Sequence, residues 1–165
     1  MTEFLDLSGY QLWDFAGIDG LQFAKALFGE GSGRIAPFQS FETSLNGYWC
    51  SVLRLCEGNF RLGLQGDATV VEQAITQLQP KHQVWVKRCA AMGAIALPET
   101  SGLNLLPQIA IPKPPHRLEG LQLNCAAATR IDGISVLIWR HQILGQSAFE
   151  LHTAVKDVEA VRAKL

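Results

Sequence analysis

A hairpin followed by a helix occurs twice in this 165-residue chain, and this repeat constrains the fold more than any other feature. The first copy runs through Ser51-Val52-Leu53, a turn, Phe60-Arg61-Leu62, and Asp67 before a helical pattern. The second runs through Ser135-Val136-Leu137, a turn, Phe149-Glu150-Leu151, and Asp157 before another helical pattern. A hairpin leaves one face of its sheet bare, and an amphipathic helix can bury that face. The repeat therefore predicts an α+β fold of two β-β-α lobes with antiparallel or mixed sheets.

The remaining elements extend each lobe, and the expected boundary lies between residues 1–90 and 91–165. A strand over 10–16 precedes a helix for which Asp19 is the expected N-cap. Residues 98–115 hold five of the seven prolines, so we expect an irregular crossing segment there. The other expected strands are 48–56, 60–64, 84–87, 121–131, 134–141 and 149–152, whereas 89–97 is ambiguous between helix and strand.

Charge and hydropathy exclude several classes of protein. The 14 basic and 15 acidic residues give a net charge of −1, and no basic run offers a nucleic-acid surface. No stretch of about 18 apolar residues is present, so we expect no membrane span. The first residues lack the basic and apolar regions of a signal peptide, which favours a soluble, cytoplasmic protein.

The cysteines and histidines show no spacing typical of a metal or redox site. Cys50, Cys56, Cys89 and Cys125 contain no C-x-x-C pair, and we expect them to be buried free thiols. The four histidines form no H-x-x-x-H motif, so we expect surface or turn positions and no metal. No nucleophile elbow, phosphate loop or close acidic pair is present either. The sequence therefore favours a protein that is not an enzyme.

The first strand, helix and hairpin resemble the YgfZ-type folate-binding proteins and the glycine-cleavage T-protein. The matching residues are Leu12 to Asp19 with Phe23 and Leu27, then Asn46-Gly47 and Ser51-Val52-Leu53-Arg54-Leu55. Ile138-Trp139-Arg140 with Phe149-Glu150-Leu151 looks like the corresponding hairpin of the second lobe. The same segments are similar to the γ subunit of heterotetrameric sarcosine oxidase. The resemblance runs from about Leu12 to the end and implies one folate-binding domain over residues 1–165, built of ferredoxin-like lobes.

The resemblance implies tetrahydrofolate as ligand, but this chain departs from the reactive motifs of the family. The catalytic aspartate of the aminomethyltransferase would fall near Ser51 or Val52, and neither is a carboxylic acid. The helix motif Q-G-Q-x-T is replaced by Lys25 to Gly29, and the signature K-G-C-Y-x-G-Q-E is absent. We expect no aminomethyl transfer. The helical pattern at the end also agrees with an N-terminal piece of a longer protein, and a natural short member is the alternative.

Four residues are the candidate folate contacts. Gln65 falls roughly where the T-protein has a pterin-contacting asparagine at a strand end. A glutamine amide could take the same role, because it can both donate and accept at a pterin edge. Arg54 could pair with a folate glutamate tail, because its guanidinium matches a carboxylate. Ser51 is one of the two residues near which the aspartate of the family would fall, and Trp49 is one of four strand tryptophans on which a flat heterocycle could stack. The alternatives are a polar strand end for Gln65, a solvent-facing Arg54 and core packing for Trp49.

These observations give one main functional expectation and two alternatives. The main one is a non-catalytic, tetrahydrofolate-binding accessory protein, linked to iron–sulfur cluster assembly or repair or to one-carbon metabolism. The first alternative is a structural or interaction subunit similar to the sarcosine oxidase γ chain, with a protein partner or self-association. The second is a microcompartment-shell-like protein, suggested by Gly66 to Val71 and Ile111 to Pro114.

Overall fold

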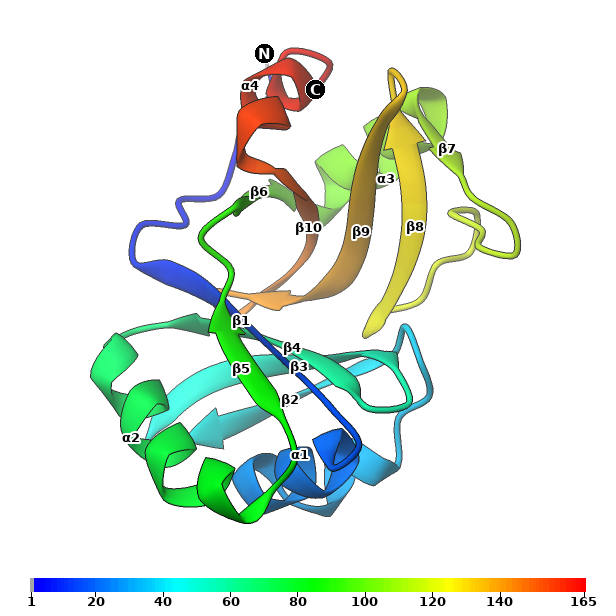
Figure 1. Cartoon of the computed structure of the whole chain (residues 1–165). Helices are drawn as coiled ribbons and strands as arrows, with labels where there is room; N and C mark the ends of the chain where they lie inside the picture. The colour runs from blue at the N-terminus through cyan, green and yellow to red at the C-terminus, as the bar shows by residue number, and fades with distance from the viewer. Residues whose placement is uncertain (1) are drawn as a thin grey trace. The chain divides into compact units, whose positions relative to one another are not determined.

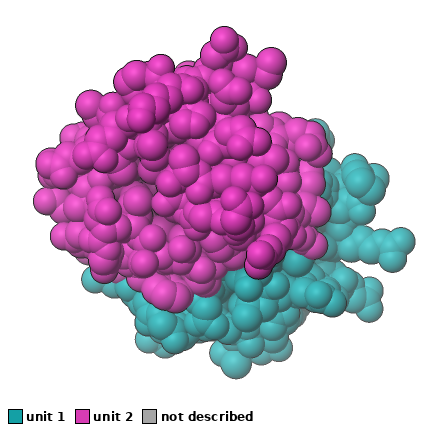
Figure 2. All heavy atoms as spheres, turned by 90° about the horizontal axis from the view of Figure 1, so that it is seen from below, with its two compact units in different colours: residues 1–7, 90–165 teal, residues 8–89 magenta. Residues whose placement is uncertain are grey.

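The computed structural model describes residues 2–165 and divides the chain into two compact units (Figures 1 and 2). Unit 1 combines Met1–Leu7 with Ala90–Leu165, and unit 2 is Ser8–Cys89. Each unit contains one five-stranded sheet, and all strand pairs are antiparallel. The α+β class and the two-lobed arrangement predicted from the repeat are confirmed. Whether residues 1–165 form one folate-binding domain stays a prediction.

Unit 2 packs two helices against one face of a sheet whose strand order is β2-β3-β4-β1-β5 (Figure 1). Its elements are β1 (Tyr10–Ala16), α1 (Gly20–Phe28), η1 (Glu30–Gly33), β2 (Ser40–Leu45), β3 (Tyr48–Cys56), β4 (Asn59–Gln65), α2 (Ala68–Leu78), η2 (Gln79–Lys81) and β5 (Trp85–Arg88). Aromatic rings lie at the centre of its hydrophobic core. Phe15 stacks on Phe60 at 5.4 Å and meets Phe23 of α1 edge-on at 5.2 Å. These geometries are the favourable ones for ring pairs, so they fix how α1 sits on the sheet.

The two predicted N-caps of this unit behave differently. Asp67 accepts a hydrogen bond from the Thr69 amide at 2.9 Å and caps α2 as expected. Asp19 makes no side-chain cap, because its carboxylate accepts from the Gln83 amide at 2.7 Å instead. Helix α1 begins at Gly20, where a Cβ would lie 1.9 Å from the Gly58 carbonyl oxygen. The close approach of the β3–β4 turn therefore requires glycine at the helix start.

Unit 1 has the strand order β6-β10-β9-β8-β7. Its elements are β6 (Met92–Pro98), α3 (Glu99–Ile109), β7 (Ala110–Pro112), β8 (Cys125–Ile131), β9 (Ile134–Ile143), β10 (Gln146–Ala154), η3 (Val155–Asp157) and α4 (Val158–Arg162). Leu106 of α3 and Val161 of α4 pack on one face of the sheet against Ile138 and Leu151. The second hairpin of the repeat is therefore β9–β10. Asp157 lies in η3 and makes no side-chain cap, unlike its counterpart Asp67.

The expectation of an irregular segment over 98–115 is wrong for most of its length. Pro98 stands at the N-cap of α3, where a missing amide costs nothing, and Pro107 lies in the last turn. Gly102 and Leu106 face the core, and Leu106 is 1% exposed. Burial of this apolar side outweighs the proline content. The ambiguous segment 89–97 contains most of β6 and is a strand.

No helix among residues 2–165 is long and apolar enough to cross a bilayer. Within the same residues, no three His, Cys, Asp or Glu side chains are placed so that they could hold a metal ion.

Candidate functional site

The candidate folate residues lie on or near the sheet of unit 2. Side chains alternate between the two faces of a strand, and Cys50 and Val52 of β3 belong to the core beneath the helices. Trp49 and Ser51 therefore lie on the opposite face, which we call the helix-free face. Leu64 of β4 pairs with Cys50, so the next residue, Gln65, lies beside Trp49 at the end of these two strands.

A partly buried ion pair crosses the helix-free face between β1 and β4. Arg61 donates from Nε to Asp14 Oδ1 at 2.7 Å and from an Nη to Asp14 Oδ2 at 2.9 Å. The two residues are directly opposite in the antiparallel register. The pairing is bidentate and matches the planar guanidinium to the carboxylate. Asp14 and Arg61 were not among the residues predicted from the sequence.

Three of the four predicted residues are gathered on this face. The Ser51 hydroxyl donates to Glu42 Oε2 of the neighbouring strand β2, and Ser51 is 4% exposed. Gln65 is exposed, and its amide donates to the Ser8 carbonyl at 2.5 Å. The Trp49 indole is 62% exposed, so core packing is wrong for this tryptophan. Trp49 and Gln65 thus offer a flat apolar surface beside an amide.

Arg54 is separated from the other three residues. By alternation it lies on the helix side of β3, and its guanidinium stands 5.4 Å from the centre of the Phe60 ring. It donates to three carbonyl oxygens, those of Ile35 at 2.9 Å, Glu57 at 2.8 Å and Cys56 at 3.3 Å. The expectation of a solvent-facing arginine is wrong, since Arg54 is 6% exposed. Its contacts hold the loops around the β3–β4 turn, and a role toward folate stays a prediction.

Two thiols of unit 2 are poor nucleophiles. Burial, assisted by the negative charge of Glu42, raises the pKa of Cys50 to about 12. Burial, assisted by Asp14, raises the pKa of Cys89 to about 11. Because only the thiolate is reactive, both groups are inert near neutral pH. The expectation of buried thiols holds for Cys50 but is wrong for Cys56, which is exposed; all four cysteines are free.

The sheet of unit 1 carries a second polar cluster, which the sequence did not reveal. His141 Nε2 lies 2.8 Å from Glu150 Oε1, and His152 Nε2 hydrogen bonds to Glu150 Oε2. The Trp139 indole stacks on the His141 ring at 3.7 Å. These four side chains, which we call the histidine–glutamate cluster, are all at most 2% exposed. They lie on the face of the sheet opposite α3 and α4, because Ile138 and Leu151 occupy the helix side.

The electrostatics of Glu150 follow from this arrangement. Burial alone raises the pKa of a carboxylic acid, since the charged form loses its hydration. The attraction of His152 and the hydrogen bonds from both imidazoles outweigh burial, and they lower the pKa of Glu150 well below its usual range. Glu150 is therefore a buried carboxylate that stays charged and holds both rings in place.

The prediction of surface or turn histidines is wrong for His141 and His152. A usable signal was present, because Glu150 and His152 occupy alternate positions of a strand whose other positions are Phe149 and Leu151. Polar residues that alternate with large apolar ones mark a defined face. What the sequence lacked was the partner, since His141 lies on β9 and reaches Glu150 only through the hairpin register.

The carboxylates described above are occupied by neighbouring groups. Asp14 is held by Arg61, Glu42 accepts from Ser51, and Glu150 accepts from two histidines. General-base catalysis requires a carboxylate or imidazole aimed at a substrate proton. Three of these four hydrogen bonds instead join neighbouring strands, and the fourth, between Glu150 and His152, lies within β10. The arrangement is that of polar pairs that fix strand register, with an exposed tryptophan and glutamine at one end.

Comparison with known proteins agrees with the architecture. No protein-family model matches the sequence, and no curated protein does. Solved structures do match over almost the whole chain. The aminomethyltransferase T of the glycine cleavage system from Bartonella henselae aligns with a TM-score of 0.72 and 17% identity, over 98% of this chain and 44% of that one. The chain has a T-protein-like fold.

A second solved structure shares the T-protein-like fold. It is the heterotetrameric sarcosine oxidase from Corynebacterium sp. U-96, in complex with pyrrole 2-carboxylate. The TM-score is 0.69 at 16% identity, and the alignment covers 99% of this chain and 80% of that one. The chain thus spans less than half of the aminomethyltransferase but most of the oxidase chain. At these identities the likeness is one of fold.

Proposed function

We propose that this chain is a non-catalytic subunit of an assembly of several polypeptides. The observation that carries the proposal is that no carboxylic acid stands where the resembling family has its catalytic aspartate. The sequence resemblance places the catalytic aspartate near Ser51 or Val52. Val52 is buried in the core, and the Ser51 hydroxyl is held by Glu42 of β2. Neither residue can replace the carboxylate in this role.

A structural neighbour supports the same proposal. The T-protein-like fold of these residues covers 80% of a chain in the heterotetrameric sarcosine oxidase and 44% of the aminomethyltransferase. The fold therefore occurs as most of one chain within a multi-chain enzyme. We take the role of this chain to be similar, with the chemistry carried by its partners.

Exposed aromatic residues supply surfaces for association. Trp49 of β3 is 62% exposed and Trp85 of β5 is 53% exposed, although both lie in regular strands. Tryptophan is enriched at protein interfaces and among their energetic hot spots. Exposed aliphatic residues occur in both units, including Ile18 at 85% and Ile111 at 72%.

Co-isolation from the cells of origin tests the proposal. The chain, tagged at its own chromosomal locus, is recovered and its co-purifying polypeptides are quantified. The proposal predicts one or more partners in a fixed molar ratio to the chain, at every salt concentration in a series. Trp85→Ser and Trp49→Ser should each lower the recovered ratio if that tryptophan lies in an interface. Recovery of the chain alone would contradict the proposal.

Folate binding is the second candidate, and the adjacency of Trp49 and Gln65 favours it. An exposed indole can stack a pterin ring, and the neighbouring amide can both donate and accept at the pterin edge. Titration with 5-formyltetrahydrofolate, followed by tryptophan fluorescence, tests this candidate. Trp49→Phe should remove the signal, and Gln65→Ala should weaken binding about tenfold, a typical loss for one hydrogen bond of a ligand.

A matched control separates folate stacking from a general quench. Trp85→Phe, at a strand tryptophan that is also more than half exposed, should leave the folate response unchanged. An absence of any response at millimolar ligand would refute the second candidate and leave the first untouched. The link to iron–sulfur cluster assembly or repair stays a prediction, since it came from the sequence resemblance alone.

A further inference from the structure

The edge strand of unit 1 is only partly covered. Strand β6 lies at one edge of its sheet and pairs with β10 on its inner side. The N-terminal segment, residues 2–7, crosses the outer side, and the Leu5 amide donates to the Ala96 carbonyl at 2.9 Å. Phe4 packs with the core on the helix side of the sheet, whereas Leu5 and Leu7 pack against Ala96 on the other side. The segment therefore wraps the edge at Ala96.

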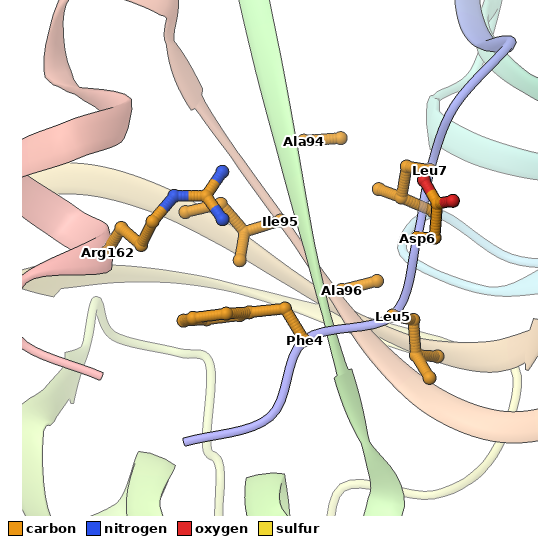
Figure 3. A pocket seen from close by; sticks show the side chains of 8 residues that line it. All are labelled: Phe4, Leu5, Asp6, Leu7, Ala94, Ile95, Ala96 and Arg162. Atoms are coloured by element: carbon orange, nitrogen blue, oxygen red, sulfur yellow. The ribbon is translucent and has the colours of Figure 1, made fainter. Parts of the chain in front are cut away.

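Beyond Ala96 the N-terminal segment and β6 diverge and leave a hollow (Figure 3). The hollow has a volume of about 340 Å³ and is lined by Phe4, Leu5, Asp6, Leu7, Ala94, Ile95, Ala96 and Arg162. Ala94 and Ala96 have the smallest side chains that a strand can present other than glycine. Small side chains leave the backbone of the edge accessible from the hollow.

The backbone of Ala94 faces the hollow. In an antiparallel ladder the residues of an edge strand alternate between pointing inward and outward. The Ala96 carbonyl points outward to Leu5, so the amide and carbonyl of Ala94 point outward as well. Among the backbone–backbone hydrogen bonds of residues 2–165, the one from Leu5 to Ala96 joins the N-terminal segment to β6, and none from this segment reaches Ala94. An unpaired outward amide and carbonyl form a template for another strand.

One wall of the hollow is cationic. Arg162 of α4 extends its guanidinium toward β6 and stands 5.0 Å from the centre of the Phe4 ring. Its ion-pair partner, Glu159, is 3.6 Å away and 86% exposed, so the pair is weak and screened by water. Asp6, the acidic residue among those that line the hollow, lies on the other side of β6 from Arg162 in Figure 3. The charge of Arg162 therefore faces a carboxylate that enters on the helix side of the strand edge.

We propose that this edge binds an extended, acidic segment of a partner polypeptide by strand addition at Ala94. The backbone of the segment pairs with the Ala94 amide and carbonyl, and one acidic side chain on the helix side meets Arg162. Apolar side chains on that side pack on Phe4 and Ile95. The inference rests on the proposed subunit role and names the chemistry of the partner segment.

Amide hydrogen exchange and chemical-shift mapping test the inference on the whole chain. The probe is the peptide acetyl-Val-Thr-Asp-Thr-Val-amide, in which the two valines and the aspartate share one face of a strand. Millimolar probe should shift the Ala94 resonance and slow its exchange, whereas the Ile95 amide, bonded to β10, is already protected in the free chain. The same peptide with lysine at its centre should bind about tenfold more weakly, because its charge opposes that of Arg162.

Two variants locate the effect. Ala94→Pro removes the outward amide, a change that edge strands tolerate, and should abolish the shifts at a melting temperature close to that of the wild type. Arg162→Glu should reverse the preference between the two peptides. Arg130→Glu, which changes an exposed arginine on β8, is the charge-matched control and should keep the wild-type preference.

Several outcomes would overturn the inference. They are an absence of shifts at Ala94 with either peptide, equal affinity for both peptides, or an Ala94 amide that is already protected in the free chain. Protection that rises with protein concentration would assign the edge to a second copy of this chain. The peptide assay requires no partner, so it separates this inference from the subunit role. Peptide binding without a co-isolated partner would refute the subunit role alone, whereas a complex unaffected by Ala94→Pro would refute the docking site alone.

Discussion

Replacement of Glu150 by glutamine should lower the stability of unit 1 more than any conservative change on its surface. The glutamine amide has the shape of the carboxylate but no charge, and its NH2 group cannot accept from an imidazole. The change removes the attraction to His152 and at least one of the two hydrogen bonds. Loss of one partner of a buried ion pair costs roughly 3–5 kcal/mol, and we expect about 3 kcal/mol for this near-isosteric change.

The pH dependence of this loss has a defined sign. The folded pKa of Glu150 is depressed, so its contribution is complete above the unfolded pKa and is lost as pH falls through the folded pKa. Below the unfolded pKa value near 4.3, the difference between wild type and Glu150→Gln should shrink by up to about 1.4 kcal/mol per pH unit.

Urea unfolding followed by tryptophan fluorescence measures the difference, because buried Trp139 stacks on His141 within the cluster. Glu159→Gln is the matched control, since Glu159 is 86% exposed and its ion pair is weak. It should change the unfolding free energy by less than about 0.5 kcal/mol. A Glu150→Gln loss below about 1 kcal/mol at pH 7, or a loss that grows as pH falls below 4, would refute the assigned role of the charge.

Three further predictions address other parts of the chain. Arg54→Lys should cost about 2 kcal/mol in urea unfolding, because the single ammonium nitrogen cannot reach the carbonyls that three separate guanidinium nitrogens contact. An unchanged midpoint would contradict this role. Gly102→Ala should lower the unfolding free energy by roughly 1–3 kcal/mol, since the new Cβ would lie 2.2 Å from Phe149 Cδ2. Helix propensity alone predicts a gain of about 1 kcal/mol, so a rise in melting temperature would contradict the steric argument. A thiol-specific disulfide reagent at neutral pH should react first with exposed Cys56, and Cys56→Ser should abolish this fast kinetic phase. Cys50 is buried and has a pKa of about 12, so it should react only on unfolding.

The sequence was sufficient for the features that depend on local pattern. The hairpin-and-helix repeat predicted β3–β4–α2 and β9–β10–α4, because alternation and helical spacing are properties of contiguous residues. Asp67 was found as an N-cap for the same reason, since its acceptor geometry involves Thr69 only two residues away. The class and the two-lobed arrangement followed from these elements.

Features that depend on long-range contact were missed. Asp19 satisfies Gln83, which is remote in sequence, so the N-cap pattern was misleading there. The proline-rich segment formed α3 because Leu106 is buried by strands that follow it in the chain. These interactions are decided by tertiary packing, which a single sequence does not show.

The candidate site shows the same division. The resemblance drew attention to β3 and β4, and Trp49, Ser51 and Gln65 do share one face of that sheet. The pairing of Arg61 with Asp14 and of Glu150 with two histidines required the register of neighbouring strands. Arg54 lies on the predicted strand, but its guanidinium donates hydrogen bonds to the carbonyls of the surrounding loops.

The mass of the chain as it occurs in its own cells tests the central claim most directly. Native mass spectrometry of the tagged chain, isolated at its natural level and diluted to nanomolar concentration, reports its associated polypeptides without assuming their identity. The subunit role predicts a discrete mass that comprises the tagged chain and one or more other polypeptides in fixed number. A spectrum that shows only the free chain, or only copies of it, would contradict the account.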